Sequence, residues 1–393
     1  MKWMMPRLLR VAALASGCLF LSRLHGAELP SRQEILDNVW HERFDELEKL
    51  TEELRGQKLV FYNGYSKLSR IYGYLEGPGR KADDSVWKDY IAKLEKWAEA
   101  YPQSPAPLVA LGNAWKDWAW KARGGGYAGS VTEEGWRLFG QRIEQARGYL
   151  EAAEKLPAKD PEVYRALIVV AMAQGWPRAQ MEAVFKKGVA LEPNYQQLYE
   201  TKAYYLLPRW NGEPGEWEAF AEQAADARGD EEGDILYMAI ARSQAWSEST
   251  QFFRNTRISY ARMKRGFEAS LRRYPDSVWE MNSYCYFACI AGDRPTAKQL
   301  FQKINGRWET EVWRNQDYFR RWQNWALNNG RVPVAATGSR VTRAPFTSAQ
   351  VTSALFVAGA IWLGVMAIAG LVVWLIVRKN RKSPPPLPPR PVQ

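Results

Sequence analysis

The chain has 393 residues and a formal charge of +11, which at first suggests a nucleic-acid-binding protein. The basic excess lies at the two ends, because residues 1–27 carry four Lys and Arg and residues 331–393 carry eight, with no acid in either range. Residues 28–330 hold 42 of the 54 basic residues and all 43 acidic ones. A body so close to neutral lacks the basic face that phosphate binding needs, so we expect no nucleic-acid binding.

The first 27 residues have the pattern of a secretory signal peptide. Three basic residues precede an apolar stretch at 11–21, and cleavage after Ala27 fits the pattern. Two alternatives remain open. The sequence Ala-Ser-Gly-Cys at 15–18 resembles a lipobox, which would place a lipid on Cys18, and the apolar stretch could also persist as an uncleaved anchor.

Residues 28–330 predict an all-α protein. Ser31 and Glu34 form a capping box, and apolar residues then recur at helical spacing as far as Leu50. A helical hairpin is predicted over 57–100, broken at Gly77-Pro78-Gly79. We divide the body into an N-terminal helical segment, 28–105, and a helical-repeat domain, 106–330.

Short turns containing proline punctuate the second part at regular intervals. Pro161 and Pro193 are 32 residues apart, close to the ~34-residue tetratricopeptide period. The clearest repeat runs from Trp279 to Ile304, where small and large residues alternate on two helices joined by Gly292-Asp293. The pattern predicts a tetratricopeptide-like α-solenoid.

Residues 115–220 carry several uncommon residues in a recognisable order. The stretches concerned are WKARGGGYA at 120–128, VT at 131–132, GW at 135–136, DP at 160–161, QGW at 174–176, ME at 181–182, and YLLPRW at 205–210 before Gly212. This part of the chain resembles an uncharacterised bacterial family of helical, tetratricopeptide-like domains that is often found in exported proteins. The resemblance implies a fold and leaves the activity open, because the family has no agreed reaction.

The chain offers little for catalysis. His41 is the one histidine of the body, and Cys285 and Cys289 lie one helical turn apart, where we expect two small buried hydrophobic residues. The glycines at 124, 126 and 129 match a dinucleotide fingerprint, but they follow a predicted helix instead of a strand. We expect no catalytic, cofactor or metal site, and no enzyme.

Tryptophan is the unusual residue: there are nineteen, sixteen of them in 28–330. Most should fill gaps between helices. Aromatic rings beside arginines at helix ends could instead stack sugars or hold an extended peptide. The candidate ligand-binding residues are Arg123, Tyr127, Trp136, Arg209 and Trp210. On the packing alternative, the two arginines bond backbone carbonyls at helix C-termini.

The C-terminal region predicts a membrane anchor. A flexible linker at 331–353 precedes a transmembrane helix at 354–377, in which 355–377 contain no charge, and a basic, proline-rich tail follows at 378–393. The basic residues place the tail in the cytoplasm and the body in the periplasm or outside the cell. Ala360 and Gly364 form a small-xxx-small pair, which favours a homodimer through this helix.

Together these features predict a single-pass protein of the cytoplasmic membrane that acts as a protein–protein interaction scaffold in the cell envelope. The expected partner is an envelope protein of unknown identity. The alternative is a protein that binds a cell-wall glycan or peptide through its Trp, Tyr and Arg loops.

Overall fold

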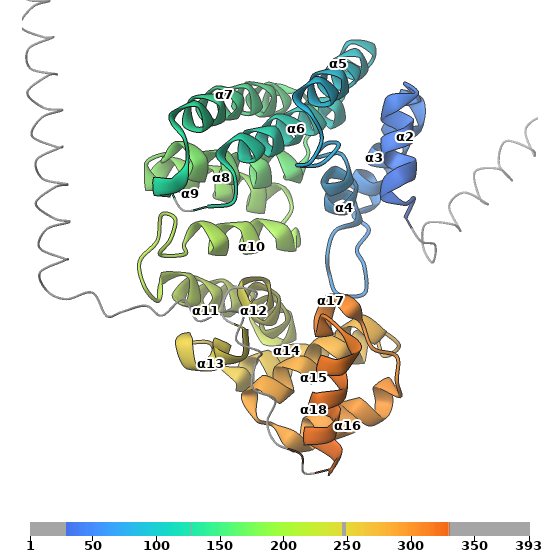
Figure 1. Cartoon of the computed structure of the whole chain (residues 1–393), viewed down its shortest axis with the longest axis vertical. Coiled ribbons are helices and arrows are strands. Elements are labelled where there is room, and N and C mark those ends of the chain that lie inside the picture. The colour runs from blue at the N-terminus through green and yellow to red at the C-terminus, as the bar shows by residue number, and fades with distance from the viewer. Residues whose placement is uncertain (1–28, 127, 246–248, 329, 331–393) are drawn as a thin grey trace, which may run out of the picture. The chain divides into compact units, whose positions relative to one another are not determined.

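Helices make up nearly all the secondary structure of the protein in this computed structural model (Figure 1). The structure describes residues 29–126, 128–245, 249–328 and 330. These residues form seventeen α-helices and no strand, with one isolated antiparallel bridge between Val60 and Ser66. The all-α prediction is therefore confirmed for this part of the chain.

The predicted terminal segments lie outside the described residues. They are the signal peptide at 1–27, the linker at 331–353, the transmembrane helix at 354–377 and the tail at 378–393. None of the helices that the structure does describe combines the length and apolar composition needed to cross a bilayer.

Four helices form the N-terminal part: α2 (Arg32–Trp40), α3 (Phe44–Gln57), α4 (Lys67–Tyr74) and α5 (Asp84–Ala100). The predicted capping box is present, since Ser31 Oγ accepts from the Glu34 amide and Glu34 Oε2 accepts from the Ser31 amide. The predicted hairpin over 57–100 was wrong at its start. Residues 58–66 leave α3 as a loop that turns at Gly64, with φ +78°, and return to α4. We call residues 58–66 the hairpin loop.

The remaining helices follow in close succession. In chain order they are α6 (Pro105–Arg123), α7 (Glu133–Lys155), α8 (Pro161–Gln174), α9 (Arg178–Leu191), α10 (Gln196–Tyr205), α11 (Glu216–Arg228), α12 (Asp230–Gln244), α13 (Phe252–Asn255), α14 (Tyr260–Arg273), α15 (Val278–Ala291), α16 (Arg294–Ile304), α17 (Thr310–Trp313) and α18 (Gln316–Asn328). Sequence neighbours pack together, with α6 against α7, α8 against α9, α11 against α12 and α15 against α16 (Figure 1). This arrangement is consistent with a helical solenoid.

The predicted proline turns fall between helices. Helices α5, α7, α9 and α14 each end two residues before the proline of the expected turn, and α8 begins at Pro161. Proline lacks the amide hydrogen that a helix interior requires and disfavours helical geometry in the residue before it, so it fixes these boundaries locally.

The repeat over Trp279–Ile304 forms as predicted from α15 and α16. Tyr284, Ala288, Ala297 and Phe301 are buried where the two helices meet, and Gly292 makes the turn with φ +79°. A left-handed conformation of this kind suits glycine because it has no Cβ. Cys285 and Cys289 are buried free thiols, as expected, and burial raises the pKa of Cys285 well above its usual value.

Buried aromatic side chains support much of the core. The largest fully buried ones include four tryptophans: Trp87, Trp97, Trp313 and Trp322. The expectation that most tryptophans fill gaps between helices is met for these residues, and several others, including Trp120 and Trp210, pack partly buried against the same core. The helices on both sides of residue 105 share this core, since α3, α4 and α5 all contact α6.

Candidate functional site

The predicted ligand-binding residues come together in part around the guanidinium of Arg123. Its Cζ lies 5.4 Å from the Trp120 ring, 5.4 Å from the Trp136 ring and 6.0 Å from the Trp210 ring. Trp120 and Arg123 lie in the last turn of α6, Trp136 lies in the first turn of α7, and Trp210 follows α10. We call these residues, with Phe139, Tyr204 and Arg209, the aromatic–arginine cluster; Tyr127 lies outside the described residues.

The rings of this cluster differ in accessibility. Trp136 is 40% exposed and Tyr204 is 37% exposed, whereas Trp210 is half-buried and meets the Trp120 ring edge-on at 5.7 Å. Cores accept such edge-to-face pairs readily. Trp210 therefore serves packing, and Trp136 and Tyr204 are the rings that a ligand could reach.

The two arginines of the cluster behave differently. Arg123 donates to the carbonyls of Gly124 and Gly126 at 3.3 and 3.1 Å, which is the loop-fixing role expected on the packing alternative. The Cζ of exposed Arg209 lies 5.2 Å from the ring of Tyr204. Arg209 is thus the more accessible cation of the pair.

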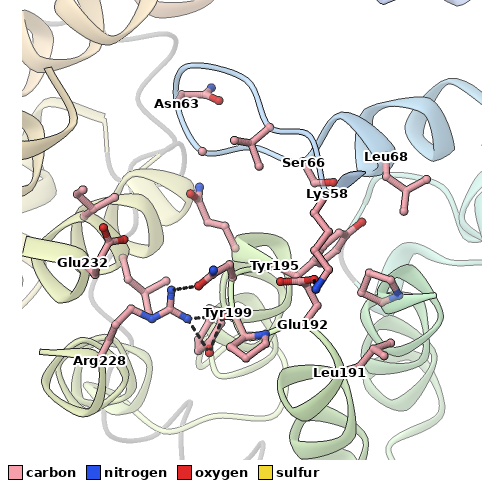
Figure 2. A pocket seen from close by; sticks show the side chains of 18 of the residues that line it. Lys58, Asn63, Ser66, Leu68, Leu191, Glu192, Tyr195, Tyr199, Arg228 and Glu232 are labelled. Carbon is pink, nitrogen blue, oxygen red and sulfur yellow. Dashed lines mark hydrogen bonds and ion pairs between the residues drawn. The ribbon is translucent and has the colours of Figure 1, made fainter. Parts of the chain in front are cut away.

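A first cleft, of about 360 Å³, lies on one side of the hairpin loop (Figure 2). Side chains from α3, the hairpin loop, the α9–α10 turn, α11, α12 and α14 line it. Arg228 donates to Asn194 Oδ1 at 3.0 Å and to the Tyr199 hydroxyl at 3.2 Å, and Lys58 forms an ion pair with Glu192. Lys58 and Arg228 therefore already have partners within the cleft.

A second cleft, of about 280 Å³, shares Asn63 and Gln196 with the first. Its lining residues come from the hairpin loop, α4, α10, α12, α15 and α17. They are Asn63, Tyr65, Arg70, Gln196, Glu200, Arg242, Ser243, Ala245, Trp279, Ser283, Tyr286, Phe287, Val312 and Arg314. Aromatic walls with a few convergent polar groups are typical of a ligand site.

The hairpin loop lines both clefts and is held by contacts with several helices. The Ser66 amide donates to Gln197 Oε1 at 3.4 Å, and Arg242 Nη2 donates to the Asn63 carbonyl at 3.5 Å. At the tip, the ring of Tyr62 lies 5.7 Å from the ring of Tyr274. The loop is thus fixed to α10, to α12 and to the end of α14.

Charges in the second cleft are unevenly compensated. Arg242 pairs with the buried carboxylate of Glu280 at 2.8 Å, and its Cζ lies 4.8 Å from the Trp279 ring. Burial raises the pKa of Glu200, and this disfavours its negative form. The guanidinium groups of Arg70 and Arg314, two residues far apart in the sequence, add positive charge to the cleft.

One face of α10 connects the clefts with the aromatic–arginine cluster. Gln196 lines both clefts, Glu200 lines the second, and Tyr204 belongs to the cluster. These residues are spaced four apart, so they follow one another along the same side of the helix. We call this face the α10 track; it spans about 12 Å between its end residues.

Sequence reasoning missed both clefts. Asn63-Gly64 is a common tight-turn dipeptide, and its position between the apolar residues Phe61 and Tyr65 was the available signal for the hairpin loop. The arginines of the second cleft gave no signal, because residues 70, 242 and 314 are far apart in the chain and meet only through the fold.

Comparison of the sequence with protein-family models gives no match, and comparison with curated proteins gives none.

Proposed function

We propose that the protein is a membrane-anchored, exported scaffold that binds an extended segment of another envelope protein along the α10 track. In this proposal the body is a tetratricopeptide-like solenoid, and the predicted helix at 354–377 tethers it to the cytoplasmic membrane, where it can pair with a second copy. The observation that carries the proposal is the line of Gln196, Glu200 and Tyr204, which joins two accessible regions on one helix.

The exposed apolar side chains support this proposal. Of the described residues, four large hydrophobic ones are exposed: Val60, Tyr62, Trp136 and Tyr204. The first two belong to the hairpin loop and the other two to the aromatic–arginine cluster, at opposite ends of the track. An extended segment of about four residues would cover ~12 Å, so one peptide could contact both regions. Solenoids commonly bind through such extended surfaces.

Site-directed cross-linking in cells tests the proposal. A photoreactive phenylalanine analogue at Tyr62, which is 64% exposed at the tip of the hairpin loop, is expected to capture one abundant envelope protein from the full-length chain. The same analogue at Glu99, an exposed residue of α5 that lines neither cleft, is the matched control and should capture none. Equal adducts at both positions, or none at Tyr62, would contradict the proposal.

A second candidate function is binding of a cell-wall glycan or peptide by the aromatic–arginine cluster. The position of Arg123 within 6.0 Å of three indole rings, together with the exposure of Trp136 and Tyr204, favours it. Flat aromatic rings can stack on sugars, and an arginine beside them can pair with the carboxylates of cell-wall peptides.

A pelleting assay with purified peptidoglycan tests this second candidate. Full-length protein in mild detergent should sediment with the glycan, and Trp136→Ala combined with Tyr204→Ala should reduce the bound fraction at least fivefold while leaving the unfolding temperature unchanged. Tyr62→Ala removes an exposed ring elsewhere and should bind normally. Undiminished sedimentation of the double variant would exclude the cluster as the binding site.

A further inference from the structure

We propose that the second cleft binds a carboxylate of the partner segment, an Asp or Glu side chain, between Arg70 and Arg314. This inference rests on the proposed function and names the chemistry that the partner must present. Its first basis is that these two arginines line the same cleft and neither has an acidic partner in the described residues.

Many arginines of the described residues are neutralised by carboxylates. Arg142 pairs with Asp84 at 2.7 Å, Arg178 with Glu216 at 2.7 Å, and Arg262 with both Asp226 and Asp234. In the same residues, no ion pair engages Arg70 or Arg314, although both line the cleft. Two uncompensated cations facing one cavity attract an anion.

Aromatic rings hold the Arg70 guanidinium in place. Its Cζ lies 5.1 Å from the Tyr65 ring and 5.8 Å from the Phe61 ring. Such stacking leaves the in-plane N–H groups free to donate to an oxygen anion and limits the side-chain entropy lost on binding. Arg70 is thus oriented before a ligand arrives.

Arg314 lines the cleft from a different element. It follows α17 with φ +65°, an uncommon conformation for a residue with a Cβ, and it lies close enough to Tyr286 for its charge to lower the pKa of that hydroxyl against the larger raising effect of burial. Residues held in this conformation are often found at binding sites. Arg70 and Arg314 therefore face the cavity from two separate elements.

Apart from Glu200, whose negative form burial disfavours by raising its pKa, the remaining groups of the cleft suit a carboxylate on an apolar stem. Arg242 is already paired with Glu280 and donates Nη2 to the Asn63 carbonyl, so it adds little net charge to the cleft. Tyr65, Trp279, Tyr286 and Phe287 provide apolar walls for the methylene groups of an acidic side chain. A volume of about 280 Å³ is near the lower end of ligand pockets and accommodates a single side chain or a small molecule.

Fluorescence anisotropy with defined peptides tests this assignment on the full-length protein in mild detergent. The probes are fluorescein-labelled (Glu-Tyr)4 and the matched peptide (Gln-Tyr)4, with free N-acetylglutamate as a competitor. We expect (Glu-Tyr)4 to bind at least about tenfold more tightly than (Gln-Tyr)4, because hydrogen bonds between charged groups are the stronger ones. Binding should weaken as the salt concentration rises.

Variants locate the site. Arg70→Gln with Arg314→Gln should weaken binding of (Glu-Tyr)4 at least about tenfold, and Arg314→Lys should retain part of the affinity. The control, Arg80→Gln with Arg320→Gln, removes the same charge from two exposed arginines that line neither cleft and should bind within about twofold of the parent. Matching unfolding temperatures verify that both double variants fold.

Each alternative outcome overturns the inference in a distinct way. Equal binding of the two peptides, or equal losses in the two double variants, would show that no carboxylate site lies in this cleft. If N-acetylglutamate displaced (Glu-Tyr)4 when present at the same concentration as the peptide, the cleft would be a site for a free small carboxylic acid instead of a partner segment. Capture of a partner at Tyr62 that persists in Arg70→Gln/Arg314→Gln would refute the carboxylate assignment and leave the scaffold proposal standing.

Discussion

Asp160→Ala is expected to lower the free energy of unfolding by roughly 3–5 kcal/mol, the cost of breaking a buried charge network by removing one partner. Asp160 is buried at the start of α8, where Oδ1 accepts from the Glu162 amide at 2.9 Å. Oδ2 accepts from the Tyr72 hydroxyl at 2.6 Å and lies 3.4 Å from Arg55. Alanine would leave the buried hydroxyl and the guanidinium without their acceptor.

This carboxylate connects α3 and α4 with α8, so its loss should weaken the attachment of these two helices to α8. Burial raises the pKa of Asp160, and the hydrogen bond from Tyr72 and the charge of Arg55 oppose that rise without cancelling it. Urea unfolding followed by circular dichroism measures the effect. Thr132→Ala is the control, because it removes an exposed helix cap whose loss costs only ~1 kcal/mol. Equal losses in the two variants would show that the buried partners contribute nothing.

Gly266→Ala is expected to destabilise the protein by roughly 2–3 kcal/mol, although the same change inside an exposed helix usually stabilises. A Cβ at position 266 would lie 2.3 Å from the Asp234 carbonyl oxygen and 2.7 Å from Met238 Cβ. Helices α12 and α14 cannot separate easily, because Arg262 and Arg265 both pair with the Asp234 carboxylate. The added methyl therefore meets backbone that has little room to move.

The control for this effect is Gly140→Ala in α7, where a Cβ would meet no atom within 4 Å. That variant should be neutral or more stable by up to ~1 kcal/mol. Urea unfolding of the three proteins side by side gives the comparison. A Gly266→Ala protein as stable as the parent would show that α12 and α14 are not in close contact in solution.

Local chemistry explains which parts of the fold were predictable. The capping box at Ser31, the proline turns and the repeat over Trp279–Ile304 depend on residues within a few positions of one another, and all are present. The error over 57–66 has the same origin. The apolar spacing of Phe61 and Tyr65 fits a helix as well as a hairpin, and what holds the hairpin loop is contact with Gln197 and Arg242, more than a hundred residues away.

The candidate site was also predictable only in part: the sequence indicated which residues meet but not how exposed each one is. Aromatic residues and arginines near helix ends indicated the aromatic–arginine cluster, and Arg123, Trp136 and Trp210 do meet there. The sequence could not distinguish an exposed Trp136 from a half-buried Trp210, because exposure depends on which helices cover each ring. The resemblance to an exported bacterial family remains a prediction.

By itself the sequence determined the helical class, the turns between helices and the near-neutral body with its basic ends, since these depend on composition and on neighbouring residues. Only the tertiary structure decided which rings stay accessible, how Gln196, Glu200 and Tyr204 align between two clefts, and which arginines lack an acidic partner. The physical reason is that burial and charge compensation are properties of the packed whole: a guanidinium is neutralised or available according to what the fold brings within a few ångströms of it.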